Sequence, residues 1–242
     1  MMLKNSTEKK EIEALFISDV HLGSRGCNSI KLIEILNTHK PKEIFIVGDF
    51  IDGWLLKKRW FWKPSFTKII RRLILLSTMG TKIVYVTGNH DDFLRAFTPF
   101  QFNNNISIVD ECIWNQYYIS HGDLYDGVVK LKWLGKLGGM GYEIAIIIDR
   151  FIKKLGYKKS LSKWLKKTVK DAVKFITNFE EQLSYQAKDR NCVGVICGHI
   201  HTPVDKSVNV GDKSIRYLNC GDWIENNSYI VYNEGDFKIY CN

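Results

Sequence analysis

The stretch from Ile44 to Asp52 constrains the fold of this chain more than any other. It begins as an unbroken apolar run and changes at Gly48 to a segment that carries two acids, Asp49 and Asp52. A continuous apolar run is typical of a strand buried on both faces of a parallel sheet. Open α/β sheets bind ligands beyond the carboxyl ends of their strands, so the two acids mark a candidate site. A simple turn after the strand is the alternative interpretation.

Strand and helix patterns alternate through the first hundred residues. Strands are predicted over residues 13–20, 44–47 and 82–87, and helices over residues 29–40 and 65–79. Ser29 is a candidate N-cap of the first helix, and Pro41 is its expected end. An aromatic and basic loop is expected at residues 54–62. This alternation predicts a parallel α/β sheet.

The pattern changes after Pro99. Adjacent strands are predicted over residues 106–114 and 117–120, followed by an essentially helical stretch to about residue 188. Strand signals return at residues 193–197 and continue as antiparallel β structure. The simplest division is a β-rich domain made of residues 1–124 and 191–242, interrupted by a helical insertion at residues 125–190.

Size and composition fit one domain with an inserted cap. The chain has 242 residues, and its hydrophobic content of 45% is ample for a core. No stretch approaches the roughly 20 apolar residues that a spanning helix needs. The polar first residues lack the apolar centre of a signal peptide, and the six scattered cysteines are expected to be reduced. We therefore expect a cytoplasmic protein.

The net charge of +9 is concentrated in the insertion. Residues 150–174 carry ten lysines and arginines against one acid, which leaves the rest of the chain neutral. Helical spacing places Lys163, Lys167, Lys170 and Lys174 on one face beside an apolar face. Such a surface suits a lipid that carries phosphates, an anionic membrane or nucleic acid. A solvated helix face is the simpler alternative.

Polar residues that can bind metal gather at the predicted strand ends. The histidines there are His21, His90, His121, His199 and His201, and beside them stand Asp19, Asp49, Asp52 and Asn89. Each of them alone is more often structural, so their joint placement carries the argument. Asp-x-His and His-x-His place two ligands on the same side of an extended segment.

This ligand set favours particular metals and a particular chemistry. Carboxylate, imidazole and one carboxamide suit Mn, Fe or Zn, and the lack of thiolates argues against a structural zinc site. Two ions about 3.5–4 Å apart hold both the attacking and the leaving oxygens of a displacement at phosphorus. No phosphate-binding loop or nucleophile elbow is present.

The motifs resemble the calcineurin-like metallophosphoesterases. The resemblance rests on Asp19-Val-His21, Gly48-Asp49-x-x-Asp52, Gly88-Asn89-His90-Asp91, His121 and Gly198-His199-x-His201, in this order. It implies a four-layer α/β/β/α sandwich around two divalent metal ions, most simply Mn, with Fe or Zn as alternatives.

The resemblance also implies a role for each matching residue. One ion would be held by Asp19, His21, Asp49 and His201, and the other by Asp49, Asn89, His121 and His199, so Asp49 would bridge the two. The catalytic residues would be His90, which acts on the leaving oxygen, and Asp52, which orients it. Asn89 and His90 would contact the substrate. The lysine-rich face of the insertion, rather than the resemblance, leads us to expect that Lys163, Lys167, Lys170 and Lys174 also contact it.

Within this superfamily the chain resembles the UDP-2,3-diacylglucosamine diphosphatases of the lipid A pathway. The shared features include Gly48-Asp-Phe-Ile-Asp-Gly-Trp54, Ser120-His-Gly-Asp123 and Asn219-Cys-Gly-Asp-Trp223. Best-known members carry arginine after the motif asparagine, where this chain has His90, as in general phosphoesterases. The resemblance implies cleavage of a nucleotide-sugar lipid to UMP and a lipid-sugar phosphate, with the insertion as a substrate lid.

The polar first residues and the lysine-rich face of the insertion together lead us to expect a cytoplasmic enzyme that is peripheral on the inner membrane. A general phosphodiesterase or nuclease, which uses the lysines to bind nucleic-acid phosphates, is the second enzyme hypothesis. A third hypothesis is a membrane-binding module without catalysis. The oligomeric state is not predictable from these features.

Overall fold

The computed structural model describes residues 10–125 and 161–242, with side chains from residue 175 onward in the second range. Contacts divide the chain into two compact units, Met1–Asp123 with Leu183–Asn242, and Leu124–Gln182. The expected catalytic domain and lid, with the boundaries given above, stay a prediction. No helix among the described residues is long and apolar enough to cross a membrane.

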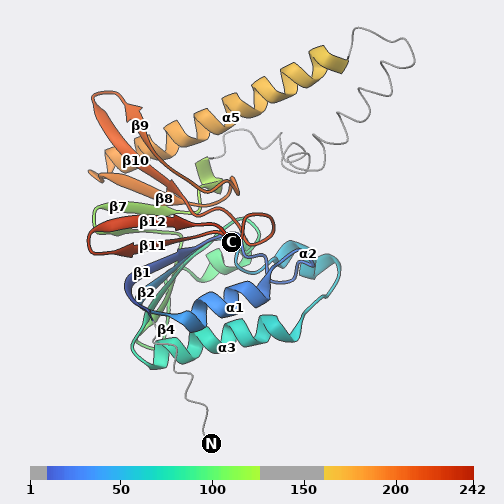
Figure 1. Ribbon diagram of the computed structural model, residues 1–242, viewed down its shortest axis with the longest axis vertical. Helices are drawn as coiled ribbons and strands as arrows, with labels where there is room; N and C mark the ends of the chain where they lie inside the picture. Colours follow the sequence, from blue (N-terminus) through green and yellow to red (C-terminus); the bar gives the residue numbers. More distant parts are fainter. Residues whose placement is uncertain (1–9, 126–160) are drawn as a thin grey trace, which may run out of the picture. The chain divides into compact units, whose positions relative to one another are not determined.

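Two β-sheets form the first unit (Figure 1). The larger sheet has the order β12-β11-β1-β2-β3-β5-β4, from β1 (Lys10–Ile17), β2 (His39–Val47), β3 (Lys82–Val86), β4 (Phe100–Phe102), β5 (Ile106–Val109), β11 (Tyr229–Asn233) and β12 (Asp236–Tyr240). The smaller has the order β6-β7-β8-β10-β9, from β6 (Glu111–Trp114), β7 (Tyr117–Ser120), β8 (Gly194–Cys197), β9 (Val204–Val210) and β10 (Lys213–Asn219). Strands β1, β2, β3 and β5 are parallel, as are β7, β8 and β10.

Helices cover the outer side of the larger sheet. They are α1 (Ser29–Thr38) and α3 (Pro64–Thr78), while α2 (Gly53–Lys58) follows β2. Short 3₁₀ helices lie at Asp92–Phe97 and Asp123–Tyr125, and α5 spans Leu161–Asp189. The last turn of α5 lies against the smaller sheet, where Lys188 Nζ donates to the carbonyl of Val210 (3.2 Å).

The side chains of each central strand alternate between two cores. On β1, Leu15 and Ile17 face the core that α1 and α3 cover, whereas Ala14 and Phe16 face the core between the two sheets. This alternation follows from the period of two in a strand and explains the unbroken apolar sequence. The predicted sandwich of sheets and helices is therefore confirmed.

Three local predictions were wrong. The single strand expected at residues 106–114 breaks at Asp110, where the chain leaves the larger sheet for the smaller. The Asp110 carboxylate fixes this crossing by accepting from Thr87 Oγ1 (2.7 Å) and Thr98 Oγ1 (2.8 Å). The N-cap of α1 is Asn28 rather than Ser29, because the Asn28 side chain accepts from Lys31 N. Pro41 lies inside β2, since that strand begins at His39.

Part of the expected aromatic loop is helical. The Asp52 side chain accepts from Leu55 N (2.9 Å) and so caps α2. Capping of this kind satisfies an N–H group that otherwise has no partner in the first turn.

Phe16 is one of the largest fully buried side chains in the core between the sheets. It is fully buried and stacks on Phe45, with ring centroids 4.8 Å apart. We expect Phe16→Ala to lower the free energy of unfolding by about 3–5 kcal/mol, measured by urea denaturation. Phe102→Ala, which removes a ring that is 54% exposed, is the matched control and should change stability much less. Equal losses in the two variants would contradict this assignment of the core.

Candidate metal centre

The predicted ligands follow the carboxyl ends of strands from both sheets. Asp19 and His21 follow β1, Asp49 follows β2, Asn89 follows β3, His121 follows β7, and His199 and His201 follow β8. Because these strands are parallel within each sheet, their carboxyl ends lie at the same edge. The structure therefore brings together residues as far apart in the sequence as Asp19 and His201.

The backbone at these positions is strained. The φ angle is positive for Asp19 (52°), His21 (51°), Asp49 (52°), His199 (69°) and His201 (60°). Residues other than glycine enter this left-handed region at a cost of about 1–2 kcal/mol each. Such strain persists only where surrounding structure enforces it, and it concentrates at functional sites.

Small neighbouring residues allow the close approach of the ligands. A Cβ atom at Gly48, whose φ is +80°, would collide with the ring of His121. A Cβ atom at Gly198 would collide with Ser18 Oγ and would lie 2.5 Å from Asp19 Oδ2. The glycines beside the histidine and aspartate motifs are therefore required by packing at the centre.

One group of ligand atoms gathers around Asp19. Asp19 Oδ1 lies 3.0 Å from His201 Nε2 and 3.8 Å from His21 Nε2. The other oxygen of Asp19 accepts from Ser18 Oγ (2.5 Å) and from His199 N (3.0 Å). One carboxylate oxygen is thus held by the protein, and the other is directed at the imidazoles.

A second group gathers around Asp49. Its Oδ2 atom lies 3.4 Å from His121 Nε2 and 3.9 Å from His21 Nε2, while Oδ1 accepts from His90 N (2.7 Å). His121 Nδ1 donates to the Val47 carbonyl (2.9 Å), so the Nε2 atom of a neutral ring carries the lone pair that faces Asp49. The ring of His199 lies beside that of His121, with centroids 5.2 Å apart.

The donor set fits divalent metal ions. Buried polar atoms without a hydrogen-bond partner include Asp19 Oδ1, His21 Nε2, His121 Nε2 and Asn89 Oδ1. Unpartnered atoms of this kind are costly inside a protein, and here they belong to the predicted ligands. Among the described residues, three groups place ligand atoms close enough together for one ion, namely Asp19 with His21 and His201, His21 with Asp49 and His90, and Asp19 with Asp49 and His121. The family resemblance leaves His90 off the metal, and Asp52 holds its ring at 3.0 Å.

Mutual attraction between acids and imidazoles shifts their pKa values in opposite directions. Burial alone would raise the pKa of Asp49, but the neighbouring His121 and His21 lower it to about 2. Burial alone would lower the pKa of His21 and His121, but the carboxylates around them raise these values to about 9 and about 10. In the metal-free protein the imidazoles thus hold protons that a metal ion must displace.

His90 lies at the edge of the cluster and is held from two sides. Its Nδ1 atom is 3.0 Å from Asp52 Oδ1, and its Nε2 atom is 4.0 Å from Asp49 Oδ2. The ring lies beside that of Trp54, with centroids 4.3 Å apart, and edge-on to His21 at 4.6 Å. The other oxygen of Asp52 is 3.4 Å from His21 Nδ1, so this acid contacts two histidines.

Sequence reasoning gave no role to two buried acids. Asp91 accepts from Gly88 N (2.5 Å), Phe50 N (2.8 Å) and Tyr85 Oη (2.5 Å), and so fixes the loop that carries Asn89 and His90. Asp222 Oδ2 lies 3.3 Å from His201 Nδ1, on the side of the ring away from Asp19. Both acids belong to motifs that the sequence analysis quoted, and membership of these motifs was the signal that could have identified them.

The four lysines assigned to substrate are not placed by the structure. Lys163, Lys167, Lys170 and Lys174 lie in the first half of α5, where side chains are outside the described residues. Most of the expected insertion, residues 126–160, is also outside them. Their role stays a prediction.

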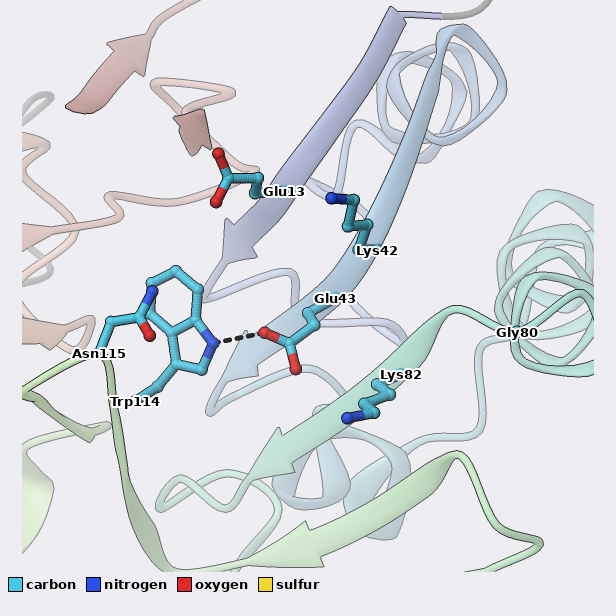
Figure 2. A pocket seen from close by; sticks show the side chains of 7 residues that line it. All are labelled: Glu13, Lys42, Glu43, Gly80, Lys82, Trp114 and Asn115. Carbon is cyan, nitrogen blue, oxygen red and sulfur yellow. Dashed lines mark hydrogen bonds between the residues drawn. The ribbon is translucent and has the colours of Figure 1, made fainter. Parts of the chain in front are cut away.

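A cavity of about 380 Å³ lies away from this centre (Figure 2). It is lined by Glu13, Lys42, Glu43, Gly80, Lys82, Trp114 and Asn115. Trp114 Nε1 donates to Glu43 Oε2 across it. The cavity contains none of the predicted ligands and lies toward the amino ends of the parallel strands, so it is not the candidate site.

Without metal, the folded protein should become less stable as pH rises. The folded pKa values of His21 and His121 lie above the value of about 6.5 for an unfolded histidine. The folded state therefore binds more protons, and this stability is fully present below about pH 6.5 and lost as pH passes 9 to 10. Urea midpoints of chelator-treated protein should fall over this range. His121→Asn should make the urea midpoint depend less steeply on pH, and the control His39→Asn should not. A urea midpoint that rises with pH would contradict the assignment.

Comparison with known proteins gives a consistent result. Curated relatives named UDP-2,3-diacylglucosamine hydrolase include one from Porphyromonas gingivalis, 28% identical over 90% of this chain and 92% of its own length. Another, from Aeromonas salmonicida, is 23% identical over 94% of this chain and 92% of its own length. A solved archaeal phosphodiesterase is 15% identical, covers 95% of this chain and 99% of its own, and has a TM-score of 0.44, too low to bear on function. The profile of the calcineurin-like phosphoesterases matches residues 12–203, and the chain therefore belongs to this family of metal-dependent hydrolases.

Proposed function

We propose that this enzyme hydrolyses the pyrophosphate bond of UDP-2,3-diacylglucosamine, or of a similar nucleotide-sugar lipid, to UMP and a lipid-sugar phosphate. Support for the reaction comes from one geometric observation, which is that His90 faces two groups of ligand atoms while Asp52 holds it. Support for the substrate comes from the relatives named for it, which align over nearly the whole chain.

The proposed ligands divide into two sets that share Asp49. Asp19, His21, Asp49 and His201 form one, and Asp49, Asn89, His121 and His199 form the other. Two divalent ions bound there, of which Mn is our first choice and Fe or Zn the alternatives, would activate water and offset the charge of the phosphoryl group.

His90 is the proposed proton donor, and Asp52 positions it. Asp52 accepts from His90 Nδ1 at 3.0 Å and directs Nε2 of the same ring toward the site. From there His90 donates a proton to the leaving oxygen of the pyrophosphate, while Asn89 and His90 contact the phosphate. Asp52 acts through His90 and is therefore a positioning residue.

The products and the variants test this function together. We expect UMP to be released from UDP-2,3-diacylglucosamine when Mn is added. His90→Ala should lower kcat by about 10²–10⁴ with unchanged metal content, because it removes a proton donor and no ligand. Asp49→Ala should lose both activity and metal, because it removes the shared carboxylate. His39→Ala is the matched control and should keep full activity; full activity in Asp49→Ala would falsify the proposal.

The presence of His90 where arginine is usual in this branch favours a second candidate, a general phosphodiesterase or nuclease. The insertion lysines separate the two candidates. Changing Lys163, Lys167, Lys170 and Lys174 together to glutamine should raise KM for the diacyl substrate and leave hydrolysis of bis(4-nitrophenyl) phosphate unchanged. A nuclease would instead show nucleic-acid binding that falls steeply with salt, with a shallower salt dependence in this variant.

We further propose that the enzyme is cytoplasmic and peripheral on the inner membrane, with the helical insertion as a lid over a lipid substrate. The charge of residues 150–174 and the diacyl chains of the proposed substrate support this.

A further inference from the structure

The segment from Trp54 to Lys63, which we call the docking segment, begins at the candidate centre. Asp52 contacts His90 and also accepts from Leu55 N at 2.9 Å, so α2 starts at the acid that positions the proposed proton donor. Trp54 lies against the His90 ring. Any surface that binds this segment is therefore held next to the centre.

The aromatic residues of this segment have a rigid base and an exposed tip. Trp62 and Phe61 pack edge-on against Phe66, which is buried in the core under α3. Trp60 stacks on Trp62 with ring centroids 6.0 Å apart, yet 74% of Trp60 is exposed. Leu55, at 42% exposed, adds apolar surface on α2.

A further exposed aromatic residue, Phe93, lies beside the start of α2. The Phe93 ring lies so close to Gly53 that a Cβ atom there would be 2.9 Å from it, and Phe93 is 49% exposed. Single exposed hydrophobic residues are common, but here they stand both on the docking segment and beside the residue at which α2 begins.

The docking segment also carries positive charge that the described structure does not neutralise. Lys57, Lys58 and Arg59 are consecutive and exposed, and no acid occurs between residues 53 and 68. Within the described residues these three side chains make no ion pair. Their charge is available to an anionic partner.

We propose that the docking segment binds an anionic lipid membrane, with Trp60 and Leu55 at the level of the headgroups and the three cations against lipid phosphates. Protein surfaces that bind membranes are enriched in tryptophan at the headgroup level, with lysine and arginine nearby. The exposed aliphatic side chain of Leu55 adds apolar area that suits the acyl region of a membrane, which favours lipid over nucleic acid. The inference deepens the proposed function, because a diacyl substrate lies in a membrane and this segment would hold the centre beside it.

Vesicle binding by the full chain tests the proposal directly. Sedimentation should show binding to phosphatidylcholine vesicles that contain phosphatidylglycerol, and weaker binding when that lipid is left out or salt is raised. Changing Lys57, Lys58 and Arg59 to glutamine should weaken binding about 100-fold. Trp60→Ser should weaken it about tenfold.

Two control variants remove three positive charges, or one exposed aromatic ring, at positions outside the docking segment. Lys42, Lys82 and Lys213, changed together to glutamine, and Phe102→Ser should each leave binding unchanged. All variants should hydrolyse bis(4-nitrophenyl) phosphate at the wild-type rate, since none alters the proposed centre. If either the triple glutamine variant or Trp60→Ser fails this check, vesicle binding by the other one decides the proposal.

Each outcome decides the proposal separately from the proposed function. Vesicle binding needs no substrate, so docking stands if binding falls in both variants even when no UMP is formed. Docking is overturned if wild-type and variants bind vesicles equally, even when UMP is formed. It is also overturned if a single-stranded oligonucleotide displaces the vesicles from the wild-type segment, because the partner is then nucleic acid.

Discussion

The site depends on the attraction between two buried carboxylates and the histidines around them. Asp19 and Asp49 are almost fully buried, and each has one oxygen held by backbone or hydroxyl donors and one directed at imidazole nitrogens. Buried carboxylates are costly unless cations compensate them. Protons on the histidines compensate them in the metal-free protein, and divalent ions would do so in the active one.

The fold explains how those groups meet. Two sheets pack face to face through a core that includes Phe16 and Phe45, and their parallel strands end at a common edge. Residues far apart in sequence reach that edge because every motif directly follows a strand. Five of the candidate ligands have positive φ angles, a strain that concentrates at functional sites and costs local stability.

Asp52 connects the proposed chemistry to the proposed membrane contact. The same carboxylate contacts His21 and His90 and caps α2, which opens the docking segment. Asp49 and Asp52, equivalent in the sequence as two acids after one strand, thus have different surroundings. Asp49 faces three histidines through one oxygen, and Asp52 joins the centre to a surface element.

Period-two burial and strand-end polar residues are local signals, and from them the sequence predicted the main strands and the convergence of the candidate ligands at one edge. It could not predict the break at Asp110. The strands on either side of Asp110 have similar patterns, and they lie in different sheets through pairing with other strands and through the contacts of Asp110 with Thr87 and Thr98. The roles of Asp91 and Asp222 were also missed. Each acts by contacts to residues that are distant in the chain or carried on another loop, which a pattern does not reveal.

The most direct test of the central claim is anomalous diffraction from crystals grown with Mn. The account predicts two anomalous peaks per chain, both within bonding distance of the Asp49 carboxylate, one beside His201 and the other beside His121. A single peak, or two peaks that do not share Asp49, would contradict it.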